Sequence, residues 1–106
     1  MSRRQEAAVR LAPEPGYESL AAVLDEALRD AQAGKGLERH ACGERFEDQQ
    51  IVQFGEWMSS TAFAIGQACK KSIESTRLPK DEAKRELLGA INYLAAAVLV
   101  LDRSRP

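Results

Sequence analysis

The feature that most constrains this chain is an uncharged, largely apolar run of 15 residues from Leu87 to Leu101. Charged residues flank this run closely on both sides, at 84–86 and at 102–103. A helix that crosses a bilayer needs about 20 apolar residues, so the run is too short to span a membrane. A helix with hardly any polar face is typical of the centre of a core. We therefore expect a buried helix over 79–103.

The start of the chain has the features of an arm rather than of a leader peptide. Its arginines are not followed by the apolar stretch of an export signal, and Pro13 and Pro15 interrupt any helix there. Two cysteines without an export signal favour a reducing compartment. We expect a flexible N-terminal arm over 1–16, a single helical domain over 17–106 and a cytoplasmic location.

Two further helices follow from the spacing of apolar residues. Three- and four-residue steps over 17–33 indicate an amphipathic helix that Gly34 closes. A similar pattern predicts one helix over 49–75, and no run predicts a strand. Gly55 and Gly66 would each cost this helix about 1 kcal/mol relative to alanine, so we expect a close approach of another helix or a break near Gly55. The apolar face of the 49–75 helix is expected to contain Ile51, Phe54, Met58, Ile65, Cys69 and Ile73.

These helices predict an all-α bundle that is completed by oligomerisation. Two other helices in a chain of 106 residues can hardly cover a helix that is apolar almost all round. We therefore expect a homo-oligomer, at least a dimer. Asn92 interrupts the apolar run next to Tyr93, and an amide in such surroundings needs hydrogen-bond partners. The partner of Asn92 is expected either across a symmetric helix contact or in a ligand pocket.

The segment 34–48 is the strongest candidate for binding a ligand. It has no periodicity, contains three of the seven glycines and includes Lys35, Arg39 and Arg45 together with the single histidine, His40. Glycine backbone and cationic side chains suit a phosphate group. The spacing does not match a Walker A motif, and a solvated loop with internal ion pairs explains the same residues.

A second basic region spans 70–85, where six lysines and arginines should gather at one end of the molecule. This end is suited either to phosphate groups or simply to solvent. A DNA-reading helix-turn-helix is not expected, because the helix after the turn soon becomes wholly apolar. The formal net charge of −1 also excludes a generally cationic nucleic-acid binder.

Acidic residues offer an alternative in which a metal ion is bound. Glu82 and Glu86 are four residues apart and therefore lie on one helix face. Together with Glu47 or Asp48 they form a candidate Mg²⁺ site. Ion pairs at the surface are the other interpretation of these carboxylates.

The stretch 86–97, ELLGAINYLAAA, resembles the last core helix of small helical proteins carried by phages and prophages, some of which are MazG-like or dATP/dGTP diphosphohydrolase-like nucleotide proteins. An Arg-His pair at 39–40 ahead of a long helix is similar to an element of that group, and the likeness covers about 34–102. MazG-type enzymes hold Mg²⁺ with Glu-Glu-x-x-Glu on one helix and Glu-x-x-Asp on the next. Here Glu47, Asp48 and Glu56 do not reproduce the first cluster, and Gly89 replaces the aspartate of the second.

The resemblance implies a small phage-type protein that binds a nucleotide or another phosphate-bearing ligand. Without a complete catalytic set, such a protein would sequester nucleotides, including the cyclic signalling nucleotides of host defence, and act as an anti-defence factor. Two alternatives stay open: an Mg²⁺-dependent nucleotide pyrophosphohydrolase, and a structural or regulatory interaction module with an exposed apolar patch. The candidate ligand-binding residues are Lys35, Arg39, His40, Arg45, Trp57, Asn92 and Tyr93, with Trp57 or Tyr93 stacking on a base.

Overall fold

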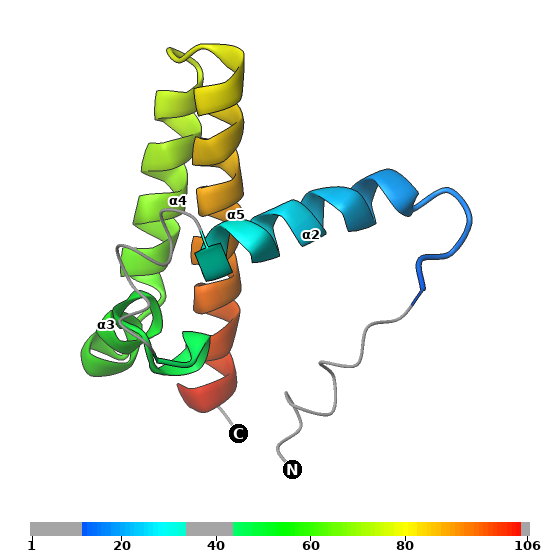
Figure 1. Ribbon diagram of the computed structural model, residues 1–106. Coiled ribbons are helices and arrows are strands. Elements are labelled where there is room, and N and C mark those ends of the chain that lie inside the picture. The colour runs from blue at the N-terminus through cyan, green and yellow to red at the C-terminus, as the bar shows by residue number, and fades with distance from the viewer. Residues whose placement is uncertain (1–11, 34–43, 105–106) are drawn as a thin grey trace.

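The computed structural model describes residues 12–33 and 44–104. Within these residues the protein contains four α-helices, one 3₁₀ turn and no strand (Figure 1), so the predicted all-α class is confirmed. No helix in this part of the chain is long and apolar enough to cross a membrane. The elements are α2 (Glu18–Ala33), η2 (Phe46–Asp48), α3 (Gln50–Met58), α4 (Ala62–Ser75) and α5 (Lys80–Ser104).

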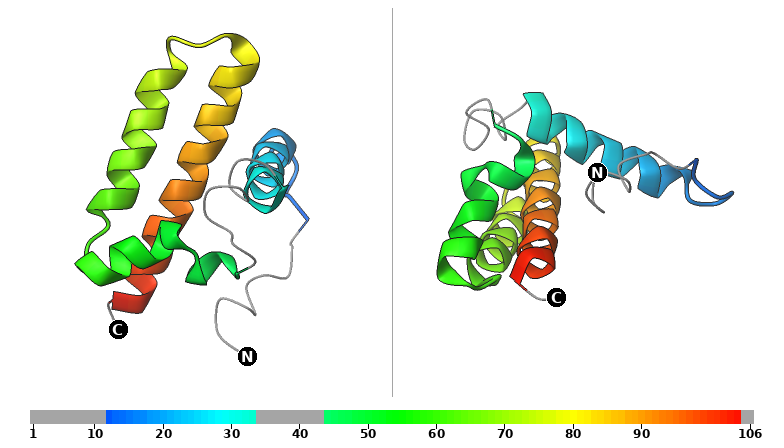
Figure 2. Two further views of the ribbon diagram at one scale, coloured as in Figure 1. Left: turned by 60° about the vertical axis from the view of Figure 1, so that its left-hand side comes forward. Right: turned by 90° about the horizontal axis from the view of Figure 1, so that it is seen from below.

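Helix α5 organises the fold, because α2, α3 and α4 all pack against it. The α4 and α5 helices lie side by side as an antiparallel hairpin, which Figures 1 and 2 show from three directions. Pro79 immediately precedes α5 and accepts a hydrogen bond from the Ala83 N–H at 2.8 Å. Asp81 and Glu82 lie in the first turn, where a negative charge stabilises the positive end of a helix.

The prediction of one helix over 49–75 is wrong, because the chain divides into α3 and α4 at Ser59–Thr61. Ser59 has a φ of 51°, in the left-handed region. The Ser60 N–H donates to the Gly55 carbonyl at 3.0 Å and the Ser59 N–H donates to the Glu56 carbonyl at 3.1 Å. This pair of bonds is a Schellman closure, which usually has glycine at the left-handed position. A serine there gave no signal in the sequence, and the break lies four residues beyond Gly55.

The close approach expected at the glycines is confirmed for Gly55 and not for Gly66. A Cβ atom added to Gly55 would lie 2.6 Å from Val100 Cγ2 of α5 and 3.1 Å from the Ser60 carbonyl oxygen. Added to Gly66, it would meet no atom within 4 Å. The absence of a side chain at Gly55 thus allows α3 to lie directly against α5.

The core is built mostly from small side chains. The expected apolar face of the 49–75 helix is correct at Ile51 but wrong at Met58, Ile65 and Ile73, which are 59%, 44% and 58% exposed. The break resets the rotation of α4, so that Ala64 and Ala68 face α5 instead. The buried core cluster consists of Ile51, Val52, Ala64, Ala68, Ala90, Tyr93, Ala96, Ala97 and Val100, with Phe46, Phe63 and Leu99 packed against it.

Helix α2 contacts α5 only through its C-terminal half. Ala27 is its one fully buried residue, and its carbonyl accepts a hydrogen bond from Asn92 Nδ2 at 3.0 Å. Lys84 Nζ lies 2.9 Å from Glu26 Oε2 at the same crossing. The N-terminal half of α2 extends away from the hairpin, on the side of α5 opposite α4 (Figure 1). The amide of Asn92 therefore has an intrachain partner, which neither of the two predicted arrangements anticipated.

Candidate functional site

The predicted phosphate-binding residues fall mainly in a segment that lies outside the described residues. Lys35, Arg39 and His40 belong to this segment, and their role stays a prediction. Arg45 is described, and its Nε lies 2.7 Å from Glu47 Oε1. That ion pair neutralises much of the charge that Arg45 would offer to a phosphate.

The other candidate ligand-binding residues are separated by the fold. Trp57 is 70% exposed on α3, and its ring meets Phe54 edge-on with centroids 5.6 Å apart. Tyr93 is 6% exposed and packs against Phe63, with centroids 6.3 Å apart, while Asn92 holds α2. Of the two aromatic residues proposed to stack on a base, only Trp57 presents its ring to solvent.

The four candidate Mg²⁺ ligands lie at opposite ends of α5. Glu86 forms an ion pair with Lys71, at 3.3 Å, near the beginning of this helix. Glu47 and Asp48 instead face Arg103, which is 17 residues further along α5, or about 25 Å at the rise of an α-helix. In the described residues no three His, Cys, Asp or Glu side chains are grouped to hold a metal ion.

Arg103 forms a cluster that the sequence did not reveal. Its Nη1 donates to the Glu47 carbonyl at 2.9 Å, and its guanidinium pairs with the Glu56 carboxylate. The Glu47 and Asp48 carboxylates lie 3.8 and 3.9 Å from its Nη2. One cation from the last turn of α5 thereby joins η2 and α3 to the end of the helix. A basic residue in a last turn is common, but its distant partners give no local signal.

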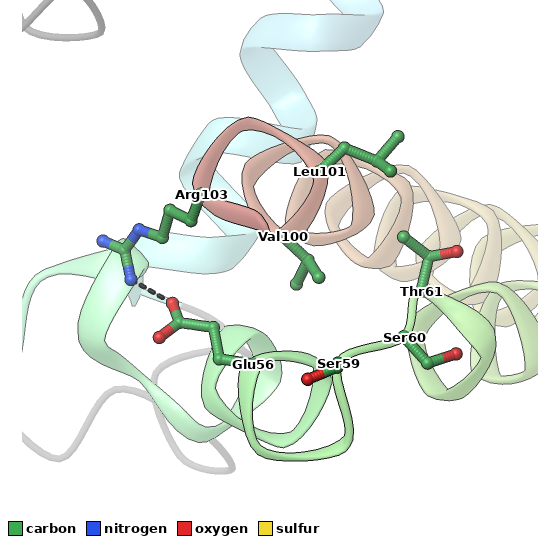
Figure 3. Close-up of a pocket in the computed structure, with 7 residues that line it drawn as sticks. All are labelled: Glu56, Ser59, Ser60, Thr61, Val100, Leu101 and Arg103. Atoms are coloured by element: carbon green, nitrogen blue, oxygen red, sulfur yellow. Dashed lines mark hydrogen bonds and ion pairs between the residues drawn. The ribbon is translucent and has the colours of Figure 1, made fainter. Parts of the chain in front are cut away.

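A pocket of about 590 Å³ lies beside this cluster. In Figure 3, Arg103 points towards Glu56 on one side of the pocket. The serine and threonine side chains of the α3–α4 connection lie on the other side. None of the candidate ligand-binding residues that the structure describes (Arg45, Trp57, Asn92 and Tyr93) lines the pocket, and three carboxylates surround Arg103, which opposes the binding of an anion. The lining residues are Glu56, Ser59, Ser60, Thr61, Val100, Leu101 and Arg103.

The basic region of 70–85 does gather at the turn of the α4–α5 hairpin, as predicted (Figure 1). Lys71 and Lys84 are engaged with Glu86 and Glu26. Lys70, Arg77, Lys80 and Arg85 are exposed, and none of these four pairs with an acidic group among the described residues. Helix α2 is acidic by contrast, with Glu18, Asp25, Glu26 and Asp30 against Arg29.

Large apolar side chains are exposed on two helices of the described structure. On α5 these are Leu87, Leu94, Val98 and Leu101, each 38–50% exposed. On α2 the exposed apolar side chains are Leu20, Val23, Leu24 and Leu28, and Tyr17 directly precedes this helix; the five side chains are 40–60% exposed. Apolar patches of this extent on a folded chain are typical of interaction surfaces.

Comparison with known proteins adds no relative, since no family model, curated protein or solved structure matches this chain.

Proposed function

We propose that this protein is a self-associating helical interaction protein whose unpartnered helix faces are covered by further copies of the chain. The observation that carries this proposal is the exposed apolar surface of α2 and α5. Self-association would bury these side chains and stabilise the assembly by about 25 cal/mol for each Å² removed from water.

The position of α2 supports the same proposal. Its apolar face packs on α5 at Ala27 and continues past α5 to Leu24, Leu20 and Tyr17, which are 49–60% exposed. A helix of 16 residues with one fully buried side chain gains little tertiary stabilisation by itself. A second copy would supply the missing contacts.

Native mass spectrometry of the purified protein tests this proposal directly. We expect a multimer at micromolar concentration, and a monomer that persists at that concentration would contradict self-association. Repeating the measurement after denaturation reports any small molecule that the native assembly retains.

A second candidate function is the capture of a phosphate-bearing ligand, such as a nucleotide, by this assembly. It is favoured by the four exposed cations at the hairpin turn, Lys70, Arg77, Lys80 and Arg85, which have no described acidic partner. The cations predicted at 35–45 would add phosphate contacts, whereas Trp57 on α3 lies at the other end of α5 from the hairpin turn. The four carboxylates of the hydrolase alternative are instead spread over both ends of α5, and three of them, Glu47, Asp48 and Glu86, are paired with Arg103 or Lys71. We therefore favour binding without turnover.

Titration with ATP and with a cyclic dinucleotide tests this second function. We expect binding that Arg39→Ala with His40→Ala abolishes while the oligomer persists. Arg77→Ala with Lys80→Ala is the matched pair for the hairpin turn, and it distinguishes the two basic regions. Unchanged affinity in both double variants would rule out these regions as the ligand site.

A further inference from the structure

We infer that the outward stripe of α5 pairs antiparallel with the same stripe of a second copy. This inference rests on the proposed self-association and specifies its interface. The outward stripe is defined as Leu87, Ile91, Leu94, Val98 and Leu101.

The spacing of the outward stripe is that of a helix-pairing seam. Its five residues follow one another at steps of four, three, four and three, which is the heptad spacing of two-stranded coiled coils. Leucine occupies one of the two alternating positions and a β-branched residue the other, so the stripe is apolar along its whole length. All but Ile91, which is half-buried, are exposed in a single copy.

The stripe is separate from the surface that α5 uses for its own fold. Tyr93, Ala96 and Val100 face α3 and α4, and Asn92 faces α2. At 100° per residue the stripe is centred about 120° from that core-facing side. Pairing through the stripe therefore displaces no contact within the chain.

Charge determines the direction of pairing. Continuing the heptad spacing towards the N-terminus of α5 reaches Lys84, which is paired with Glu26, and then Lys80, which has no acidic partner among the described residues. A parallel pair would bring Lys80 of one copy beside Lys80 of the other, which is repulsive. An antiparallel pair instead places Lys80 near the C-terminal end of the partner's α5, where the helix dipole is negative.

The available area identifies a second copy as the occupant. The four exposed side chains of the stripe and the exposed apolar side chains of α2 together present on the order of 700 Å², close to the about 800 Å² that each partner contributes to a standard interface. The α2 surface can contribute because α2 extends beyond α5 on the side away from α4 (Figure 1). A two-fold antiparallel pair uses this surface twice, once from each copy.

Disulfide cross-linking tests the pairing and its direction. The background is Cys42→Ser with Cys69→Ser, since Cys69 is a free, exposed thiol. Under mild oxidation we expect Leu94→Cys, near the middle of the stripe, to form covalent dimers. Leu87→Cys and Leu101→Cys should cross-link when mixed and hardly at all alone. If each cross-links readily by itself, the pairing is parallel and the inferred direction is wrong.

A charge substitution separates this inference from the proposed function. Leu94→Glu should weaken self-association at least about tenfold, because the pair would bury two carboxylates side by side. Ile73→Glu is the matched control on the outer face of α4, where the native side chain is 58% exposed, and should leave the oligomer intact. A monomeric native protein would overturn self-association itself. An oligomer that survives Leu94→Glu and lacks the Leu94→Cys cross-link would overturn only the α5 pairing.

Discussion

The inner and outer faces of α5 differ in a way that reverses the usual arrangement of a monomeric helical protein. The inner face is largely alanine, at Ala90, Ala96 and Ala97, whereas the outer face is leucine and valine. Small inner side chains let α3 and α4 approach closely, but they bury little area per residue. Several large apolar side chains of α5 (Leu87, Leu94, Val98 and Leu101) are instead 38–50% exposed in a single copy. This difference is expected of a subunit, in which close helix approach forms the fold and large side chains form contacts between copies.

The most severe test of this comparison is to enlarge one alanine on each face. Ala96 is 0% exposed, so Ala96→Leu should overpack the core and lower the free energy of unfolding by about 3 kcal/mol. Ala95→Leu, on the exposed side of the same helix, should change it by less than about 0.5 kcal/mol. Urea unfolding at one fixed protein concentration measures both, because the stability of an oligomer depends on concentration. Equal losses would mean that the two faces do not differ in packing.

Shortening a valine on each face sharpens the same contrast. Val100 is 2% exposed, and Val100→Ala should lower the free energy of unfolding by about 2 kcal/mol. Val98 is 47% exposed, and Val98→Ala should barely alter the unfolding of a dilute, dissociated sample. Val98→Ala should instead raise the dissociation constant of the oligomer, measured by analytical ultracentrifugation. A variant that unfolds earlier without any change in association would place Val98 in the core of a single copy.

Alanine substitutions at the two glycines of α3 and α4 should change the free energy of unfolding in opposite directions. Gly55→Ala should lower the free energy of unfolding by about 1–2 kcal/mol, because its Cβ would overlap a methyl group of Val100. Gly66→Ala should raise it by about 1 kcal/mol, since the site is open and alanine favours the helix. Thermal unfolding measures both effects.

Combining Gly55→Ala with Val100→Ala then tests the contact itself. If the two groups meet as described, the double variant should lose less stability than the sum of the single variants. Strict additivity would show that the methyl group of Val100 is not what restricts Gly55.

The smallest expected effect concerns the α3–α4 connection, whose position sets the inward face of α4. Ser59→Gly should raise the free energy of unfolding by about 0.5–1 kcal/mol, because glycine adopts a φ of 51° without a steric cost. Ser60→Gly is the control and should be neutral or destabilising, since Ser60 Oγ accepts a hydrogen bond from the Ala62 N–H at 3.0 Å. Chemical denaturation measures the stability of both variants. A loss of stability in Ser59→Gly would contradict this account.

Sequence periodicity predicted α2 and α5 well, because each is continuous and its spacing is a local property. Periodicity failed between α3 and α4, because the helical spacing of apolar residues continues without interruption across the break. The left-handed residue there is Ser59 rather than glycine, so the two strongest local indications both favoured one helix. The outcome followed from packing: with the break, Gly55 lies against Val100 and Ala64 faces α5.

The candidate sites were less predictable than the helices. The sequence required a partner for Asn92, but only the fold identifies it as the Ala27 carbonyl. The partners of Arg103 are 47–56 positions away along the chain, and no spacing rule connects them. The predicted Mg²⁺ site required carboxylates near both ends of α5 to meet. The length of this helix prevents that.

The sequence by itself determined that this chain is helical and that α5 is apolar on more sides than its neighbouring helices can cover. Both properties depend on residue type and local spacing. Only the tertiary structure decided which apolar residues are inside. That choice depends on where α4 begins and how closely α3 and α4 can approach α5. Since close approach requires small side chains, alanines form much of the core, and Leu87, Leu94 and Leu101 of α5 remain exposed in a single copy.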